Sequence, residues 1–190
     1  MRNPFFERTV VLLWHHDEEG AIGVVVNRTL EQRLPDVLEL EEDLSAYSDT
    51  PVAWGGPVET SMGTVVTPDP STIGDDGWQL PRGLGVTRSH DGLVQVVRAQ
   101  APMMLCLGYA GWGAGQLDRE VEEGSWLFTE ADPGLLFGTP AEDRHQLHRH
   151  VAGRGRCGAD QSLTGLDGYS SMGCIQTVEG VSPSVASARS

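Results

Sequence analysis

The segment with the clearest potential for chemistry is a glycine-rich stretch, LGYAGWGAGQL, at residues 107–117. Glycines between an apolar run and a helix-like run let a ligand approach the backbone, and a helix start attracts anions. Glu130 lies 19 residues beyond Gly111, which suggests a dinucleotide-binding fingerprint. However, Gln116 stands where that fingerprint needs glycine, and bulky Trp112 stands in the phosphate loop. A tight structural corner is therefore the competing interpretation.

Two further sets of residues contain the types that act as nucleophiles. Ser89, His90 and Asp91 are contiguous, so their side chains point in different directions and cannot form a catalytic relay. Cys106 stands inside an apolar run, where burial raises the pKa of a thiol and leaves little thiolate. Neither set predicts a catalytic residue.

Histidines near residue 145 have the spacing of potential metal ligands. His145 and His148 are three residues apart, His150 follows, and Asp143 is close by. Zinc suits such donors, but its ligands must converge from fixed elements, and this group precedes a segment without core character. We therefore predict no metal site and no cofactor.

The charge of the chain limits its partners. All 13 basic residues among the 190 are arginine, and the net charge is −14. Residues 1–143 hold 8 Arg and 24 acidic residues, a net charge of −16, whereas residues 144–190 carry +2. Direct nucleic-acid binding needs a basic surface and is not expected. Apolar runs are too short to span a bilayer, and residues 1–9 do not resemble a signal peptide, so we expect a cytoplasmic protein without membrane contact.

The pattern of apolar residues predicts an α+β fold. Strands are expected at 9–14, 21–27, 51–54, 62–67, 103–109 and 125–129, and helices at 34–44, 92–99 and 116–123. Ser89 is the expected N-cap of the second helix, and Asp132 and Thr139 mark further helix starts. Hairpins without regular strand–helix alternation argue against a doubly wound sheet. From about residue 153 apolar periodicity ends, which predicts a disordered tail.

Several motifs occur together and in order. They are NPFFERTVV at 3–11, GAIGVVVNR at 20–28, WGGPV at 54–58, TRSHD at 87–91, LGYAGWGAGQL at 107–117, LLF at 135–137, TP at 139–140 and EDR at 142–144. Through these motifs the chain resembles the AlgH/YqgE family of bacterial proteins, over about residues 3–144. The family has no established biochemical activity.

The resemblance implies a compact α+β fold with a mixed, bent, partly barrel-like β-sheet flanked by short helices. It divides the chain into an AlgH-like domain at 1–152 and a Gly/Ser-rich tail at 153–190. It implies a cytosolic protein, sometimes described as a transcriptional regulator, and brings no catalytic residues. The matching residues that could line a ligand groove are Asn27, Gly55, Gly56, Arg88, Tyr109, Trp112 and Gln116.

The chain departs from the family pattern at both ends. Family members usually begin with an extra apolar strand before the position of Phe5, so we expect either a missing sheet edge or a start site that is set too late. After Arg144 they continue with a tryptophan and a helix, which this sequence does not follow.

Two classes of function remain open. The first is a non-enzymatic regulatory protein whose groove near Trp112 and Arg88 accepts a small ligand or a partner protein, with any effect on genes being indirect. The alternative is an enzyme that acts on a phosphorylated or nucleotide-like molecule at Gly111–Gly115, with His16 or Asp118 handling protons.

Overall fold

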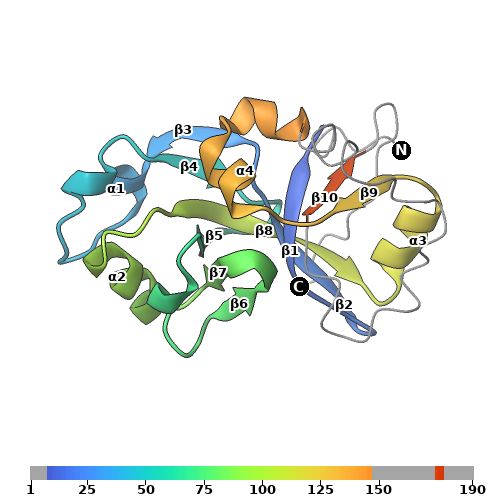
Figure 1. Cartoon of the computed structure of the whole chain (residues 1–190), viewed down its shortest axis with the longest axis horizontal. Coiled ribbons are helices and arrows are strands. Elements are labelled where there is room, and N and C mark those ends of the chain that lie inside the picture. The colour runs from blue at the N-terminus through green and yellow to red at the C-terminus, as the bar shows by residue number, and fades with distance from the viewer. Residues whose placement is uncertain (1–7, 147–173, 178–190) are drawn as a thin grey trace.

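The structure, a computed structural model, describes residues 8–146 and 174–177 (Figure 1). Its strands are β1 Val10–Asp17, β2 Gly20–Val25, β3 Thr29–Arg33, β4 Pro51–Trp54, β5 Val58–Thr67, β6 Trp78–Leu80, β7 Leu84–Thr87, β8 Met104–Gly113, β9 Trp126–Thr129 and β10 Cys174–Thr177. Its α-helices are α1 Leu34–Val37, α2 His90–Arg98, α3 Gln116–Glu122 and α4 Pro133–Gly138. Short 3₁₀ turns lie at Ser45–Tyr47, Pro70–Thr72, Pro81–Gly83 and Ala141–Gln146.

The strands form one mixed, bent sheet in the order β6-β7-β5-β8-β2-β1-β10-β9, with β4 pairing β3 and β8 beside this path. Only the β4–β8 pair is parallel among the described pairs. The helices are few and short and flank the sheet (Figure 1). The predicted class, an α+β fold with a partly barrel-like sheet, is confirmed.

Strand β8 joins the two halves of the sheet. Its first half pairs with β4 and β5, and its second half pairs with β2. The change of partner falls near Gly108, which has a φ of +75°, a conformation that side chains rarely adopt. A Cβ on Gly108 would lie 2.3 Å from the carbonyl oxygen of Gly56. Only glycine therefore allows the backbones to approach this closely.

The core lies on both faces of the sheet. Val10, Leu12 and Trp14 of β1 pack in one cluster of buried residues, while Val11 and Leu13 pack in another. Alternate residues of a strand face opposite sides, so a strand buried on both faces is apolar throughout. This explains the continuous run that predicted the first strand.

The caps of two helices agree with the sequence. The Ser89 hydroxyl accepts a hydrogen bond from the Gly92 amide at 3.0 Å, and α2 begins at the next residue. The Asp132 carboxylate accepts one from the Leu135 amide at 3.0 Å at the start of α4. The predicted order of helices and strands from α2 to α4 is confirmed.

The helix predicted at 34–44 is wrong beyond its first turn. Helix α1 ends at Val37, and Leu38 is extended, with φ −116° and ψ 127°. The four acidic residues at 39 and 41–43 would stand at the negative end of a continued helix and repel one another there. Leu38, Leu40 and Leu44 instead pack against the core from an irregular segment.

Within the predicted tail, Cys174–Thr177 forms a short strand, β10, between β1 and β9, which the sequence did not predict. Four residues are too few for a periodic pattern to be recognised, and both partners lie far away in the sequence. The other residues of the predicted tail lie outside the described part. Among the described residues, no helix combines the length and apolar character needed to cross a bilayer.

Two glycines of the 107–117 segment give a matched pair for testing the close approach. Gly108→Ala should lower the free energy of unfolding by more than about 1 kcal/mol, because it adds a left-handed backbone cost to a backbone clash. Gly111→Ala should have little effect, since its Cβ would meet its nearest atom at an ordinary 3.5 Å. Chemical unfolding of both variants measures the change in the free energy of unfolding. Equal losses of stability in the two variants would contradict the conclusion that only glycine fits at position 108.

Candidate functional site

The indole of Trp112 is interior. The residue is only 4% exposed, so its ring is packed within the fold. Trp112 and Trp126 meet edge to face at 5.7 Å between ring centroids. Their Nε1–H groups both donate to Oε2 of Glu120, at 3.1 and 2.8 Å. One carboxylate thus satisfies two buried indoles.

Glu120 is itself 7% exposed, and its other oxygen is also bonded. Its Oε1 accepts a hydrogen bond from Nε2 of Gln116 at 2.9 Å, while Oε1 of Gln116 accepts from the Gly113 amide at 3.1 Å. This network fastens α3 to the end of β8 and to β9. Burying a carboxylate is costly unless it is fully hydrogen-bonded, and here three donors, the two indoles and the Gln116 amide, meet that need.

The glycine-rich segment does not form a bare loop. Strand β8 continues through Gly111, which pairs with Ile22 of β2, and ends only at Gly113. Gly115 then adopts a φ of +62° immediately before α3. The predicted corner is present but shorter than expected, because the glycines of β8 serve strand pairing.

Asn27 has a structural role at the end of β2. Its Oδ1 accepts a hydrogen bond from the Val10 amide at 2.8 Å, and its Nδ2 donates to the Arg8 carbonyl at 2.7 Å. The oxygen and the nitrogen of the Asn27 side-chain amide therefore both hold the segment that leads into β1.

Four of the predicted site residues lie together. The Arg88 guanidinium lies 5.0 Å from the ring centroid of Tyr109, a cation–π distance. Gly55 and Gly56 approach the same part of β8 so closely that a Cβ on Gly56 would lie 2.1 Å from the Tyr109 carbonyl oxygen. The structure separates this corner from Trp112, which belongs to a different core cluster.

Arg88 is also paired with an acid. Its Nη2 donates to Oε2 of Glu59 at 3.0 Å, while its Nε is buried and has no hydrogen-bond partner among the described residues. Glu59 has a φ of +46°, an uncommon conformation for a residue with a side chain. Backbone strain of this kind is found at functional positions.

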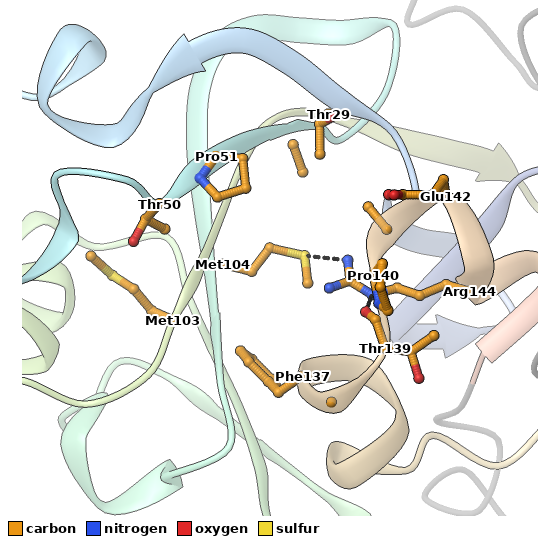
Figure 2. A pocket seen from close by; sticks show the side chains of 13 residues that line it. Thr29, Thr50, Pro51, Met103, Met104, Phe137, Thr139, Pro140, Glu142 and Arg144 are labelled. Carbon is orange, nitrogen blue, oxygen red and sulfur yellow. Dashed lines mark hydrogen bonds between the residues drawn. The ribbon is translucent and has the colours of Figure 1, made fainter.

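The structure also contains a hollow that the sequence did not predict. It has a volume of about 540 Å³ and lies between β3, β4, the start of β8 and the α4–3₁₀ segment (Figure 2). Its wall is largely apolar, with Pro51, Met103, Met104 and Phe137 among the lining residues. Glu142 and Arg144 add charged groups at one side.

Arg144 is fixed in that wall. Its Nε donates to the Thr139 carbonyl at 3.1 Å, and its Nη1 contacts the Val26 carbonyl and the Met104 sulfur. None of the seven predicted ligand residues lines the hollow. The signal that could have found it was present, because the motifs at 139–140 and 142–144 belong to the resemblance.

The residues with possible acid–base or nucleophilic roles are placed as follows. Ser89 is used as a helix cap. His16 lies 3.2 Å from Asp118, Nε2 to Oδ1, with the His16 side chain 11% exposed. Burial raises the pKa of the Cys106 thiol to about 12, although the positive charge of Arg144 opposes the shift. Cys106 is therefore a neutral core residue at physiological pH.

The histidines that were considered as possible metal ligands lie only partly within the described residues. His148 and His150 lie outside the described residues, whereas His145 lies in the 3₁₀ turn at Ala141–Gln146. Within the described ranges, no group of three or more His, Cys, Asp or Glu side chains could hold a metal ion.

The fold is of the α+β class, with one mixed, bent sheet flanked by a few short helices. Comparison of sequences then gives the family: the AlgH-like family (DUF179) matches residues 1–154. A UPF0301 protein of Paraburkholderia phymatum is 40% identical over 151 residues, which cover 77% of this chain and 79% of that protein. The chain belongs to the AlgH-like family.

Solved structures agree. The solution structure of the AlgH protein from Pseudomonas aeruginosa matches with a TM-score of 0.62 and 31% identity, covering 90% of this chain and 93% of that one. Protein DIP2367 from Corynebacterium diphtheriae matches with a TM-score of 0.60 and 20% identity, covering 83% of each chain, which supports the fold alone.

Removing the Glu120 carboxylate should destabilise the domain strongly. Glu120→Ala removes the carboxylate that accepts hydrogen bonds from two buried indole N–H groups, so the free energy of unfolding should fall by about 3 kcal/mol or more. Glu122→Ala, which removes the same charge from an exposed position of α3, should cost less than about 0.5 kcal/mol. Denaturant unfolding followed by tryptophan fluorescence measures both; similar losses would show that charge, and not the network, matters.

Cys106 should be unreactive in the folded protein. In a Cys157→Ser, Cys174→Ser background, a thiol reagent at pH 8 should label it only after unfolding, because a pKa of about 12 leaves almost no thiolate. Rapid labelling at pH 8 without denaturant would contradict the burial.

Proposed function

We propose that this chain is a non-enzymatic binding protein of the cytoplasm, whose small ligand occupies the hollow beside Arg144. The observation that supports this is the hollow itself. Its volume of about 540 Å³ falls within the range of roughly 300–1,000 Å³ that small-molecule sites have. Such sites are mostly apolar with a few fixed polar groups, and the wall of this one has that composition.

The chemistry of the wall indicates the class of ligand. Met103, Met104 and Phe137 favour an apolar body, and methionine sulfurs adapt to irregular shapes. Arg144 supplies a positive charge whose position is set by its bonds to Thr139 and Val26. An amphipathic small molecule with a carboxylate or a carbonyl group near Arg144 fits this arrangement best.

The corner formed by Arg88 and Tyr109, with Gly55 and Gly56 beneath it, is the second contact that we propose. The buried Nε of Arg88 and the strained Glu59 favour an anionic group of a ligand or partner at this place. Asn27, Trp112 and Gln116 already use their polar groups within the fold, so we assign them a structural role and not a contact with the ligand.

Any regulatory effect on genes would then pass through another protein. The 1–143 part carries a net charge of −16, which repels the phosphate backbone of nucleic acids. A ligand that fills the hollow would stabilise the folded state and change the surface around α4, and a partner protein could read that change.

Gly138 offers a direct test of the hollow. It lines the cavity at the end of α4, and a Cβ there would meet no atom within 4 Å. Gly138→Leu should therefore project a side chain into the cavity without a clash at Cβ, whereas Gly138→Ala should leave most of the space open. We expect amphipathic carboxylates to raise the melting temperature of the wild type and of Gly138→Ala, but not of Gly138→Leu.

The same screen separates binding from catalysis. A ligand that stabilises the protein and is recovered unchanged after prolonged incubation supports a binding role. Its conversion by wild type, but not by Gly138→Leu, would show an enzyme acting in the hollow. If all three proteins were stabilised equally, the ligand would lie elsewhere, and the proposal that it occupies the hollow would fail.

A further inference from the structure

The sulfur of Met104 lies beside the guanidinium of Arg144 in the wall of the hollow. Sδ of Met104 is 3.8 Å from Nη1 of Arg144, a contact that Figure 2 shows as a dashed line. The same nitrogen donates to the Val26 carbonyl and Nε donates to the Thr139 carbonyl, so the guanidinium is held in place. A fixed, charged donor thus faces a thioether, which is only a weak acceptor.

The hollow gives small oxidants access to this sulfur. Met104 is 7% exposed and borders a space of about 540 Å³, which is far larger than a molecule of hydrogen peroxide. Several residues that line the hollow are exposed, and they form an opening to solvent: Thr29, Pro51, Gly138, Pro140 and Glu142. A small hydroperoxide can therefore reach Met104 without unfolding of the domain.

Oxidation of Met104 would place a much stronger acceptor where Arg144 already points. A sulfoxide oxygen is strongly polar, and burying such a group without a donor is costly. A bent S=O···H–N arrangement with an O···N distance of about 2.8 Å needs a sulfur-to-nitrogen separation close to the present 3.8 Å. The guanidinium can thus bind the new oxygen from its present position.

Met103, the preceding residue, provides an internal comparison. It is 6% exposed, almost the same as Met104, and it also borders the hollow. The two side chains pack in different core clusters, and Figure 2 shows that of Met104 pointing toward Arg144 and that of Met103 pointing away from it. Exposure alone would make the two methionines equally reactive, whereas the contact with Arg144 distinguishes them.

We propose that Met104 is a site of oxidation by hydroperoxides, and that Arg144 binds the resulting sulfoxide. The sulfur attacks the outer peroxide oxygen with a lone pair, and the O–O bond breaks. The sulfur is oxidised to the sulfoxide, and the peroxide is reduced to an alcohol, or to water if it is hydrogen peroxide. The proton of the transferred oxygen passes to the departing oxygen. Because Arg144 is fixed on one side of the sulfur, one of the two sulfoxide epimers is favoured.

The modification would also regulate the ligand site, a consequence that rests on the proposed function. The sulfoxide oxygen would engage the guanidinium that a ligand carboxylate needs, and it would add a polar group to an apolar wall. The affinity for an amphipathic carboxylate should therefore fall by about tenfold or more.

Two single variants test the modification site. Met103→Leu keeps Met104, and Met104→Leu keeps Met103, with nearly conserved volume in both. The folded proteins are treated with hydrogen peroxide, and the tryptic peptide 99–119 is fragmented in a mass spectrometer. Met103→Leu should gain one oxygen at Met104, whereas Met104→Leu should gain almost none at Met103. Met62, which is 42% exposed, should be oxidised in both and shows that the treatment worked. Equal oxidation of the two retained methionines, or none at Met104, would overturn the proposal.

The stereochemistry of the sulfoxide tests the role of Arg144. Methionine sulfoxide reductases act on one epimer each, so treating the peptides with either enzyme gives the ratio of epimers. Met62 should give a mixture, whereas Met104 should give mainly one epimer. Arg144→Lys keeps the charge but lacks the planar fork, and it should lose this preference. A mixture at Met104 in the wild type would overturn the role of Arg144, whether or not Arg144→Lys folds.

A binding measurement separates this proposal from the proposed function. Met103→Leu should bind a stabilising carboxylate about tenfold or more weakly after peroxide treatment, whereas Met104→Leu should have equal affinities before and after it. Unchanged affinity of oxidised Met103→Leu would overturn the regulatory consequence and leave the ligand site standing. If no carboxylate bound the untreated proteins, the proposed function would fail, while selective oxidation of Met104 to one epimer would still support the modification site.

Discussion

The contact between the backbones of β8 and the β4–β5 connection is the constraint on which the rest of the structure depends. Gly56 and Gly108 approach each other so closely that neither position has room for a side chain. At this point β8 leaves β4 and β5 and begins to pair with β2. The sheet can bend here because glycine accepts the positive φ that the bend requires.

The bend has consequences for both candidate sites. It places the Tyr109 ring beneath Arg88 on one side, and it directs Trp112 into the core, where Glu120 and Trp126 hold it. The glycine-rich segment, chemically the most suggestive part of the sequence, is therefore largely architectural. The start of the same strand, at Met103 and Met104, forms part of the wall of the hollow. The start of β8 thus borders the proposed ligand site, whereas the end of the same strand stabilises the fold.

Features determined by local sequence were predictable. The continuous apolar run of β1, the Ser89 cap and the Asp132–Pro133 start each depend on a few adjacent residues. The seven proposed ligand residues were less informative, because a glycine can serve a ligand or a strand crossing with the same sequence pattern. The hollow could not be predicted from periodicity, since its lining runs from Thr29 to Arg144; only the motifs at 139–140 and 142–144 pointed to part of it. β10 was missed because its partners are more than 40 residues away.

The central claim is that small ligands bind beside Arg144 and not at the glycine-rich segment. The most direct measurement is an NMR titration of the protein, labelled at methionine methyl groups and tryptophan indoles, with an amphipathic carboxylate that stabilises it. The account predicts shifts of the Met103 and Met104 methyl signals, with the Trp112 and Trp126 indole signals almost unchanged. Large shifts of the two indole signals, with the methionine methyl signals unchanged, would contradict this account.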